Sequence, residues 1–273
     1  DEEWIEELLA WLPDDYDPAA FSVDEVNQQL LAAPLPDLAN WHPLIADLLD
    51  RYHGGPLSPL GRLIKDATTG ATDLSDAQAQ GAVRRYQHLL RTIGDGVKLT
   101  AAGYLPPRIV HALYLELGLH QRWIGAGNRE DQTLPVLDLR ETATALGLLR
   151  KHNGRLSLTR FATQHLDDPR ALLAHIGSRL PLGRPYERDA GLVALLQAAV
   201  GQPLVDLDQY AGGILLDVGW RVDGATIEQA ARQWTWPTMS VFEILTADTT
   251  DPGLRATIAR SLLHRGGPAP KHG

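Results

Sequence analysis

The stretch that decides the fold is Gly147-Leu-Leu-Arg-Lys-His-Asn-Gly-Arg-Leu-Ser-Leu-Thr159. Its centre, Asn153-Gly154, is the strongest short-range signal for a hairpin, because a tight two-residue turn needs positive φ at both central positions. The residues from Arg155 to Thr159 then alternate between polar and apolar with period two, as a half-buried strand does. The stretch therefore predicts a strand, a turn and a second strand, after which Thr159 can cap a helix.

A hairpin this small is not stable alone, so helices on both sides must cover its apolar face. The sequence supplies a helical pattern before Gly147 and another over residues 160–166. The order helix, strand, turn, strand, helix is typical of the back half of a winged helix.

A similar pattern occurs earlier in the chain. Leu89 to Thr100 matches Leu148 to Thr159 at a constant offset of 59 residues, and both segments contain Leu-Leu-Arg, a glycine turn and a closing Leu-Thr. Self-similarity at a fixed offset predicts a repeated structural unit with a second hairpin.

We therefore predict a mainly α fold with two small β-hairpin wings, made of tandem winged-helix-like units and a C-terminal helical layer. Near the C-terminus, Thr226–Trp234 and Pro237–Leu245 are predicted as separate helices, with Trp220, Trp234 and Trp236 as core anchors. The predicted parts are an acidic helical N-terminal segment (1–50), a first winged-helix-like unit (51–118), a second (119–182), a C-terminal helical region (183–265) and a flexible tail (266–273).

The charge is distributed unevenly. The chain has a net charge of −9, but residues 1–50 contain 13 acidic residues and no lysine or arginine. Residues 51–170, which hold both predicted hairpins, carry 16 basic and 11 acidic residues. This asymmetry indicates an acidic arm beside a surface for a charged ligand, or else simply a solvated acidic segment.

Composition is typical of a globular protein, with 44% hydrophobic and 22% charged residues. No apolar run is long enough to span a membrane, and the acidic start lacks the basic residues of a signal peptide. The chain has no cysteine, which excludes disulfides and favours a cytoplasmic location. It begins at Asp1 rather than at a methionine, which is consistent with a fragment of a longer protein.

Basic residues near the two hairpins are the candidate nucleic-acid contacts. The helix from Ser75 to Thr92 precedes the first hairpin, where a recognition helix would lie, whereas Val136–Leu146 is too acidic to favour DNA. The structural alternative is an ordinary solvated helix face. The candidates are Arg84, Arg85, Gln87, His88 and Arg91 on the first helix, and Lys98, Arg150, Lys151, Arg155 and Arg160 on or beside the wings.

The sequence carries no enzyme signature. None of the ten histidines has metal-ligand spacing, and neither a Walker loop nor a Gly-x-Gly-x-x-Gly motif occurs, so no metal and no cofactor is expected. His53, followed by Gly54-Gly55, is the only candidate for a catalytic loop, and no serine or cysteine motif accompanies it.

Two phrases, Val97-Lys-Leu-Thr-Ala-Ala-Gly-Tyr-Leu-Pro-Pro107 and Leu148–Thr159, carry a resemblance. Over residues 85–245 the chain resembles a bacterial group, common in actinobacteria, whose members often carry a plasmid open-reading-frame-3-like (transposon-associated) domain. That domain itself is not recognisable here. The resemblance implies a helical, winged-helix-like region and brings no catalytic residues.

Two functions follow from these patterns. The first is a non-enzymatic nucleic-acid-binding protein that uses winged-helix-like units, with DNA as its partner. The second is a protein-interaction or scaffold module in which the winged folds and the acidic N-terminus bind another protein. An enzyme with His53 is a third hypothesis, no membrane partner is expected, and the oligomeric state is open.

Overall fold

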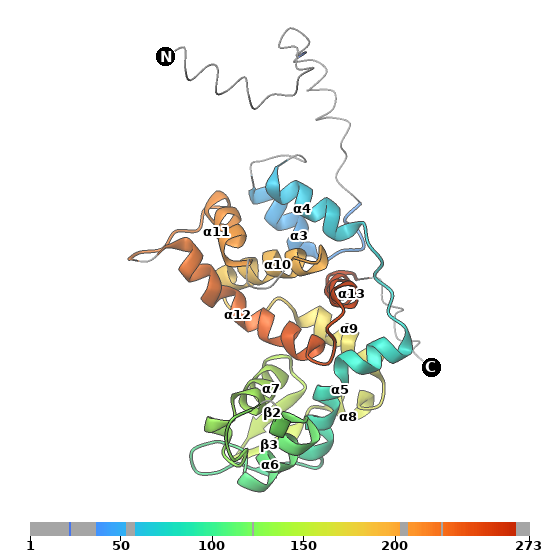
Figure 1. Cartoon of the computed structure of the whole chain (residues 1–273), viewed down its shortest axis with the longest axis vertical. Coiled ribbons are helices and arrows are strands. Elements are labelled where there is room, and N and C mark those ends of the chain that lie inside the picture. The colour runs from blue at the N-terminus through green and yellow to red at the C-terminus, as the bar shows by residue number, and fades with distance from the viewer. Residues whose placement is uncertain are drawn as a thin grey trace. The chain divides into compact units, whose positions relative to one another are not determined.

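The computed structural model describes Ser22 and residues 37–52, 58–121, 123–202, 207–224 and 226–265 (Figure 1). The chain divides into two compact units, residues 1–35 and 36–273, and every helix and strand described below belongs to the second. This part is mainly helical and contains one small antiparallel sheet, which confirms the predicted mainly α class. The predicted helices within residues 1–36 and the loop at His53 lie outside the described residues.

The sheet and the helices around it come from six α-helices and β-strands that follow one another along the chain. Its strands are ordered β1-β3-β2 and are antiparallel. The six elements are α5 (Asp76–Ile93), β1 (Val97–Lys98), α6 (Pro107–Glu116), α7 (Leu134–Ala145), β2 (Leu149–His152) and β3 (Arg155–Leu158).

Helix α5 is defined at both ends, as predicted. The Ser75 side chain accepts a hydrogen bond from the backbone of Gln78, and the Gln78 side chain accepts one from the backbone of Ser75, which completes a capping box. The buried face of the helix includes Tyr86 and Leu90. Gly94, with φ 49°, ends the helix because it adopts a backbone conformation that other residues avoid.

The hairpin predicted from Asn153-Gly154 is present. Asn153 and Gly154 have φ values of 47° and 70°, and β2 pairs with β3 from Leu149 opposite Leu158 to His152 opposite Arg155. The turn residues thus adopt the backbone that the sequence motif requires.

The hairpin expected in the earlier segment, Leu89–Thr100, is not formed. Leu89 to Ile93 form the last turn of α5, in line with the helix predicted to Thr92, and Leu89, Leu90 and Ile93 are all buried. Only Val97–Lys98 is extended, and it pairs with Leu156 and Arg155 of β3. The two similar segments therefore contribute to one three-stranded sheet instead of forming two separate wings.

The domain boundaries predicted at residues 50, 118, 182 and 265 stay predictions. The pairing of β1 with β3 does, however, cross the one at residue 118.

A buried carboxylate connects the parts around the sheet. Glu130, in a short 3-10 helix (Glu130–Gln132), has a side chain with no exposed surface. Its carboxylate accepts hydrogen bonds from the backbone N–H of Leu105, at 2.7 Å, and from Nε of Arg140 on α7, at 2.6 Å. It therefore fixes the turn after β1 to the helix that leads into the hairpin.

Helix α10 (Pro185–Ala199) lies at the centre of the remaining helices. Its residues from Asp189 to Ala199 are all buried, as in a helix that is covered on every side. A Cβ at Gly191 would overlap the Thr238 side chain, so this glycine permits the close approach of its neighbour. The helices packed against α10 are α3 (Pro43–Arg51), α4 (Pro59–Thr68), α11 (Leu207–Asp217), α12 (Ile227–Thr246) and α13 (Pro252–Leu263).

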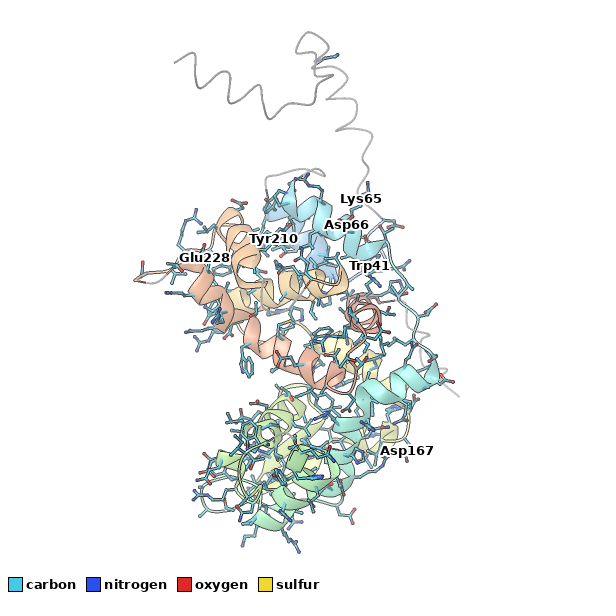
Figure 2. The ribbon with its side chains drawn as sticks, viewed as in Figure 1. Trp41, Lys65, Asp66, Asp167, Tyr210 and Glu228 are labelled. Atoms are coloured by element: carbon cyan, nitrogen blue, oxygen red, sulfur yellow. The ribbon has the colours of Figure 1, made fainter. Side chains whose placement is uncertain are left out.

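Two predictions in this layer were wrong. The two helices expected around Pro237 are the single helix α12, whose buried residues beyond the proline, such as Phe242, hold it together despite the missing N–H. Trp236 is 51% exposed and is not a core anchor, whereas Trp220 and Trp234 pack against the core. Between α11 and α4, the Tyr210 hydroxyl donates to the carbonyl of Pro59 at 2.9 Å (Figure 2).

Helices α8 (Arg160–His165) and α9 (Pro169–Arg179) follow the hairpin, and α9 contacts both α5 and α13. The start of α3 is joined to the end of α13 by a β-bridge between Trp41 and His264. None of the described helices is both long and apolar enough to cross a membrane.

His42 caps α3 and is buried. Its Nδ1 accepts a hydrogen bond from the backbone N–H of Leu44, which requires an unprotonated nitrogen. Burial lowers the pKa of His42 to about 4, and the positive charges of Arg265 and Arg188 act in the same direction. The neutral imidazole is therefore part of the folded structure.

Replacing Glu130 tests the buried ion pair. Glu130→Ala leaves Arg140, which is 13% exposed, without its main partner and should lower the free energy of unfolding by about 3–5 kcal/mol, measured by chemical denaturation. The control is Asp131→Ala, which removes an exposed acid paired with Arg129 and should cost about 0–1 kcal/mol. Equal denaturation midpoints for the two variants would contradict the assigned role of Glu130.

The His42 cap predicts a pH dependence of stability. Because the pKa is lower in the folded than in the unfolded state, the unfolded chain binds the extra proton between the ordinary value of 6.5 and about 4. The contribution of His42 is therefore complete above pH 6.5 and is lost as the pH falls toward 4. His42→Asn retains a capping oxygen without titrating, so its Tm should fall less over this range than that of the wild type.

Candidate nucleic-acid interface

The arginines of α5 are engaged with carboxylates of the protein itself. Arg85 donates two hydrogen bonds to Asp248, at 2.7 and 3.3 Å, and Arg84 lies 2.8 Å from the same carboxylate. Burial acts to raise the pKa of Asp248, but the hydrogen bonds from Arg85 and Arg84 outweigh it and hold the pKa below its ordinary value. Since the Arg85 side chain is only 14% exposed, its charge is largely neutralised within the fold.

The other three candidates on α5 are also engaged in internal contacts. Gln87 is buried, and its amide donates to the carbonyl of Leu166 at 2.9 Å and accepts from Gln80. Arg91 forms an ion pair at 2.7 Å with Asp167, which follows α8 (Figure 2), and His88 lies 3.7 Å from Glu116. The structure therefore gives α5 the role of a packing helix, in contact with α6, α7, α9 and α12.

The outer face of the three-stranded sheet carries a different set of charges. Directly opposed residues in antiparallel strands project to the same face, and successive residues alternate. Lys98, Arg155 and His152 are opposed to one another across β1, β3 and β2, and all three are exposed. Arg150 and Ser157, two pairs further along, share this face with them.

The two remaining candidates lie beside this face. Lys151 is opposed to Leu156 and therefore projects toward the other side of the sheet, where its Nζ lies close to Gly103. Arg160 is exposed at the first position of α8, just beyond β3. The structure thus brings Lys98, Arg150 and Arg155 together and separates them from the α5 group.

The cations of the sheet have no acidic partner within the described ranges. Lys98, Arg150, Lys151, Arg155 and Arg160 take part in none of the ion pairs formed there. Arg155 donates to the carbonyl of Gly96 at 3.0 Å, and Arg150 approaches the Ser157 hydroxyl at 3.4 Å. Both contacts hold the guanidinium groups in place without neutralising them.

Helix α7, which leads directly into the hairpin, is not basic. Glu141, Ala145 and Leu134 are its exposed residues, while Arg140 is tied to Glu130. Burial raises the pKa of Asp138, and the charge of Glu141 adds to this effect. The helix next to the hairpin therefore offers an acidic and apolar surface.

Sequence reasoning missed two features of this region. His152 was not among the candidates, although the period-two alternation from Arg150 places it on the same face. The acids that neutralise α5 could not be inferred, because Asp248 lies 163 residues from Arg85 and no local pattern joins them. Among the described residues, no cluster of three or more histidine, aspartate or glutamate side chains could hold a metal ion.

Comparisons with protein-family models, with curated proteins and with solved structures found no match to the chain.

The difference between the paired arginines of α5 and the unpaired cations of the sheet can be measured as a difference in the free energy of unfolding. Arg85→Ala removes a largely buried, doubly hydrogen-bonded group and should lower the free energy of unfolding by about 1–3 kcal/mol. Arg150→Ala removes an exposed arginine without an acidic partner and should change it by less than about 0.5 kcal/mol. The same loss in both variants, measured by urea denaturation, would show that the two groups are not distinct.

Proposed function

We propose that the chain binds duplex nucleic acid through the outer face of the sheet, defined by Lys98, Arg150, His152, Arg155 and Ser157. The order helix, strand, helix, helix, strand, strand, with β1 added beside β3, supports assigning residues 76–158 to one winged-helix unit. In that assignment the β2–β3 hairpin is the wing and α7 occupies the position of the recognition helix. A second, tandem unit is not part of the proposal.

The observation that carries the proposal is the contrast between two sets of basic residues. Arg84, Arg85 and Arg91 are paired with carboxylates, whereas Lys98, Arg150 and Arg155 are not paired with any described acid. Lysine and arginine that remain free can neutralise phosphates and release the counterions of a nucleic acid. A sheet face with several such groups is suited to contact a phosphate backbone.

The composition of the site defines the expected mode of binding. The outer face of the sheet has no phenylalanine, tyrosine or tryptophan on which unpaired bases could stack, which favours a duplex over a single strand. The acidic and apolar surface of α7 offers few groups that read base edges. Binding should therefore depend on salt and only weakly on sequence.

A protein partner is the second candidate function. Leu115, Ile124 and Leu134 belong to α6, to the α6–α7 connection and to the start of α7, and all are exposed, Ile124 by 98%. Exposed apolar side chains of this size are typical of protein-binding surfaces when they form one patch. Retention of a protein partner at high salt, its loss in Ile124→Ser, and no affinity for any duplex would favour this function.

Charge reversal tests nucleic-acid binding. The slope of log affinity against log salt for a short duplex should be about −3 if the three free cations each neutralise a phosphate, and Lys98→Glu should reduce its magnitude by about 1. Lys65→Glu, at an exposed lysine on α4 (Figure 2), is the matched control and should bind like the wild type. Fluorescence anisotropy measures both, and absence of binding to any duplex at low salt would rule out the proposal.

A further inference from the structure

The tip of the β2–β3 hairpin is formed by the dipeptide Asn153-Gly154. Asn153 and Gly154 are both exposed, and they lie between His152 and Arg155. Gly154 has no side chain, and even a Cβ added to it would have no neighbour within 4 Å, so no other described group crowds this residue. The tip therefore places an unhindered amide nitrogen next to an asparagine side chain.

Neither group is held by a hydrogen bond from the described residues. The Asn153 carboxamide and the Gly154 N–H take part in none of the hydrogen bonds found there, although the Gly154 carbonyl accepts from Leu99 at 2.8 Å. The hairpin is thus anchored through the carbonyl of Gly154, while its nitrogen remains available.

We propose that Asn153 is a site of spontaneous deamidation that lowers the charge of the outer sheet face. The Gly154 nitrogen, after losing its proton to hydroxide, attacks Cγ of Asn153; a C–N bond forms, the C–NH2 bond breaks, and ammonia leaves after protonation. The resulting five-membered imide reacts with water at either carbonyl. The products are aspartate and isoaspartate, and no oxidant or reductant takes part.

Two other described asparagines provide internal controls. Asn40 precedes Trp41, whose nitrogen donates to the carbonyl of Leu38 at 2.9 Å and is therefore engaged. Asn128 precedes Arg129, which has a side chain that hinders attack by its nitrogen. Of the four asparagines in the sequence, Asn153 alone is followed by glycine.

The consequence for binding rests on the proposed function. Aspartate at position 153 places a negative charge beside Arg155 and His152, within the only sheet of the described structure. If it cancels one phosphate contact, affinity for a duplex should fall roughly tenfold at 0.1 M salt, and the magnitude of the salt slope should fall by about 1. Isoaspartate also lengthens the backbone within a two-residue turn.

The first experiment measures the chemistry alone. The full chain is kept at mildly alkaline pH, and peptide mapping by mass spectrometry follows the amide-to-acid conversion at each asparagine. Conversion at Asn153 should exceed that at Asn40 and Asn128 throughout, and Asn153→Gly should abolish it at this position. An Asn153 amide that persists as long as those of Asn40 and Asn128 overturns the proposal.

The second experiment measures the effect on binding with two variants that keep the turn. Asp-Gly and Gly-Gly both suit this turn type, so Asn153→Asp and Asn153→Gly differ mainly in charge. The aspartate variant should show the tenfold loss, and the glycine variant should match the wild type. Equal affinities of the two variants overturn the effect on binding, whereas a wild type that binds no duplex overturns the proposed function and leaves the peptide map to decide the deamidation.

Discussion

The pairing of the α5 arginines with Asp248 and Asp167 determines how the rest of the molecule can act. Asp248 follows α12 and Asp167 follows α8, so these contacts join the sheet-bearing elements to the later helices through charge as well as through packing. They also pair the three arginines of α5 with carboxylates. Lys98, Arg150 and Arg155 of the sheet, by contrast, form no ion pair with a described acid.

Local patterns in the sequence predicted the elements that depend on local chemistry. Asn153-Gly154 predicted the hairpin, and Ser75 marked the start of α5, because both signals act over a few residues. The same patterns failed where distant contacts decide. The hairpin expected within Leu89–Thr100 was wrong, since its extended part pairs with the distant strand β3, and Pro237 did not end its helix, since packing on α10 continues beyond it.

The candidate site was predicted only in part, because contacts between distant parts of the chain bring its residues together. Lys98, Arg150 and Arg155 were recognised as basic residues of strands, but their common face follows from a register that only the folded sheet shows. Arg85 looked equally available on a helical projection, and its partner is far away in the chain. A basic residue in the sequence therefore indicates a charged surface only once its acidic partners within the fold are known. The three-dimensional structure shows these partners.

The outer face of the sheet is complete only when the two-residue strand β1 is paired with β3. Lys98 and Arg155 are neighbours only because β1 pairs with β3 across a loop that contains α6 and α7. Closing such a loop costs conformational entropy, which the few hydrogen bonds of a strand this short offset only together with the helices in between. Local opening of β1 would separate the charges without unfolding the hairpin. A ligand that contacts both residues stabilises the closed strand by mass action, so binding and the order of this edge are thermodynamically linked.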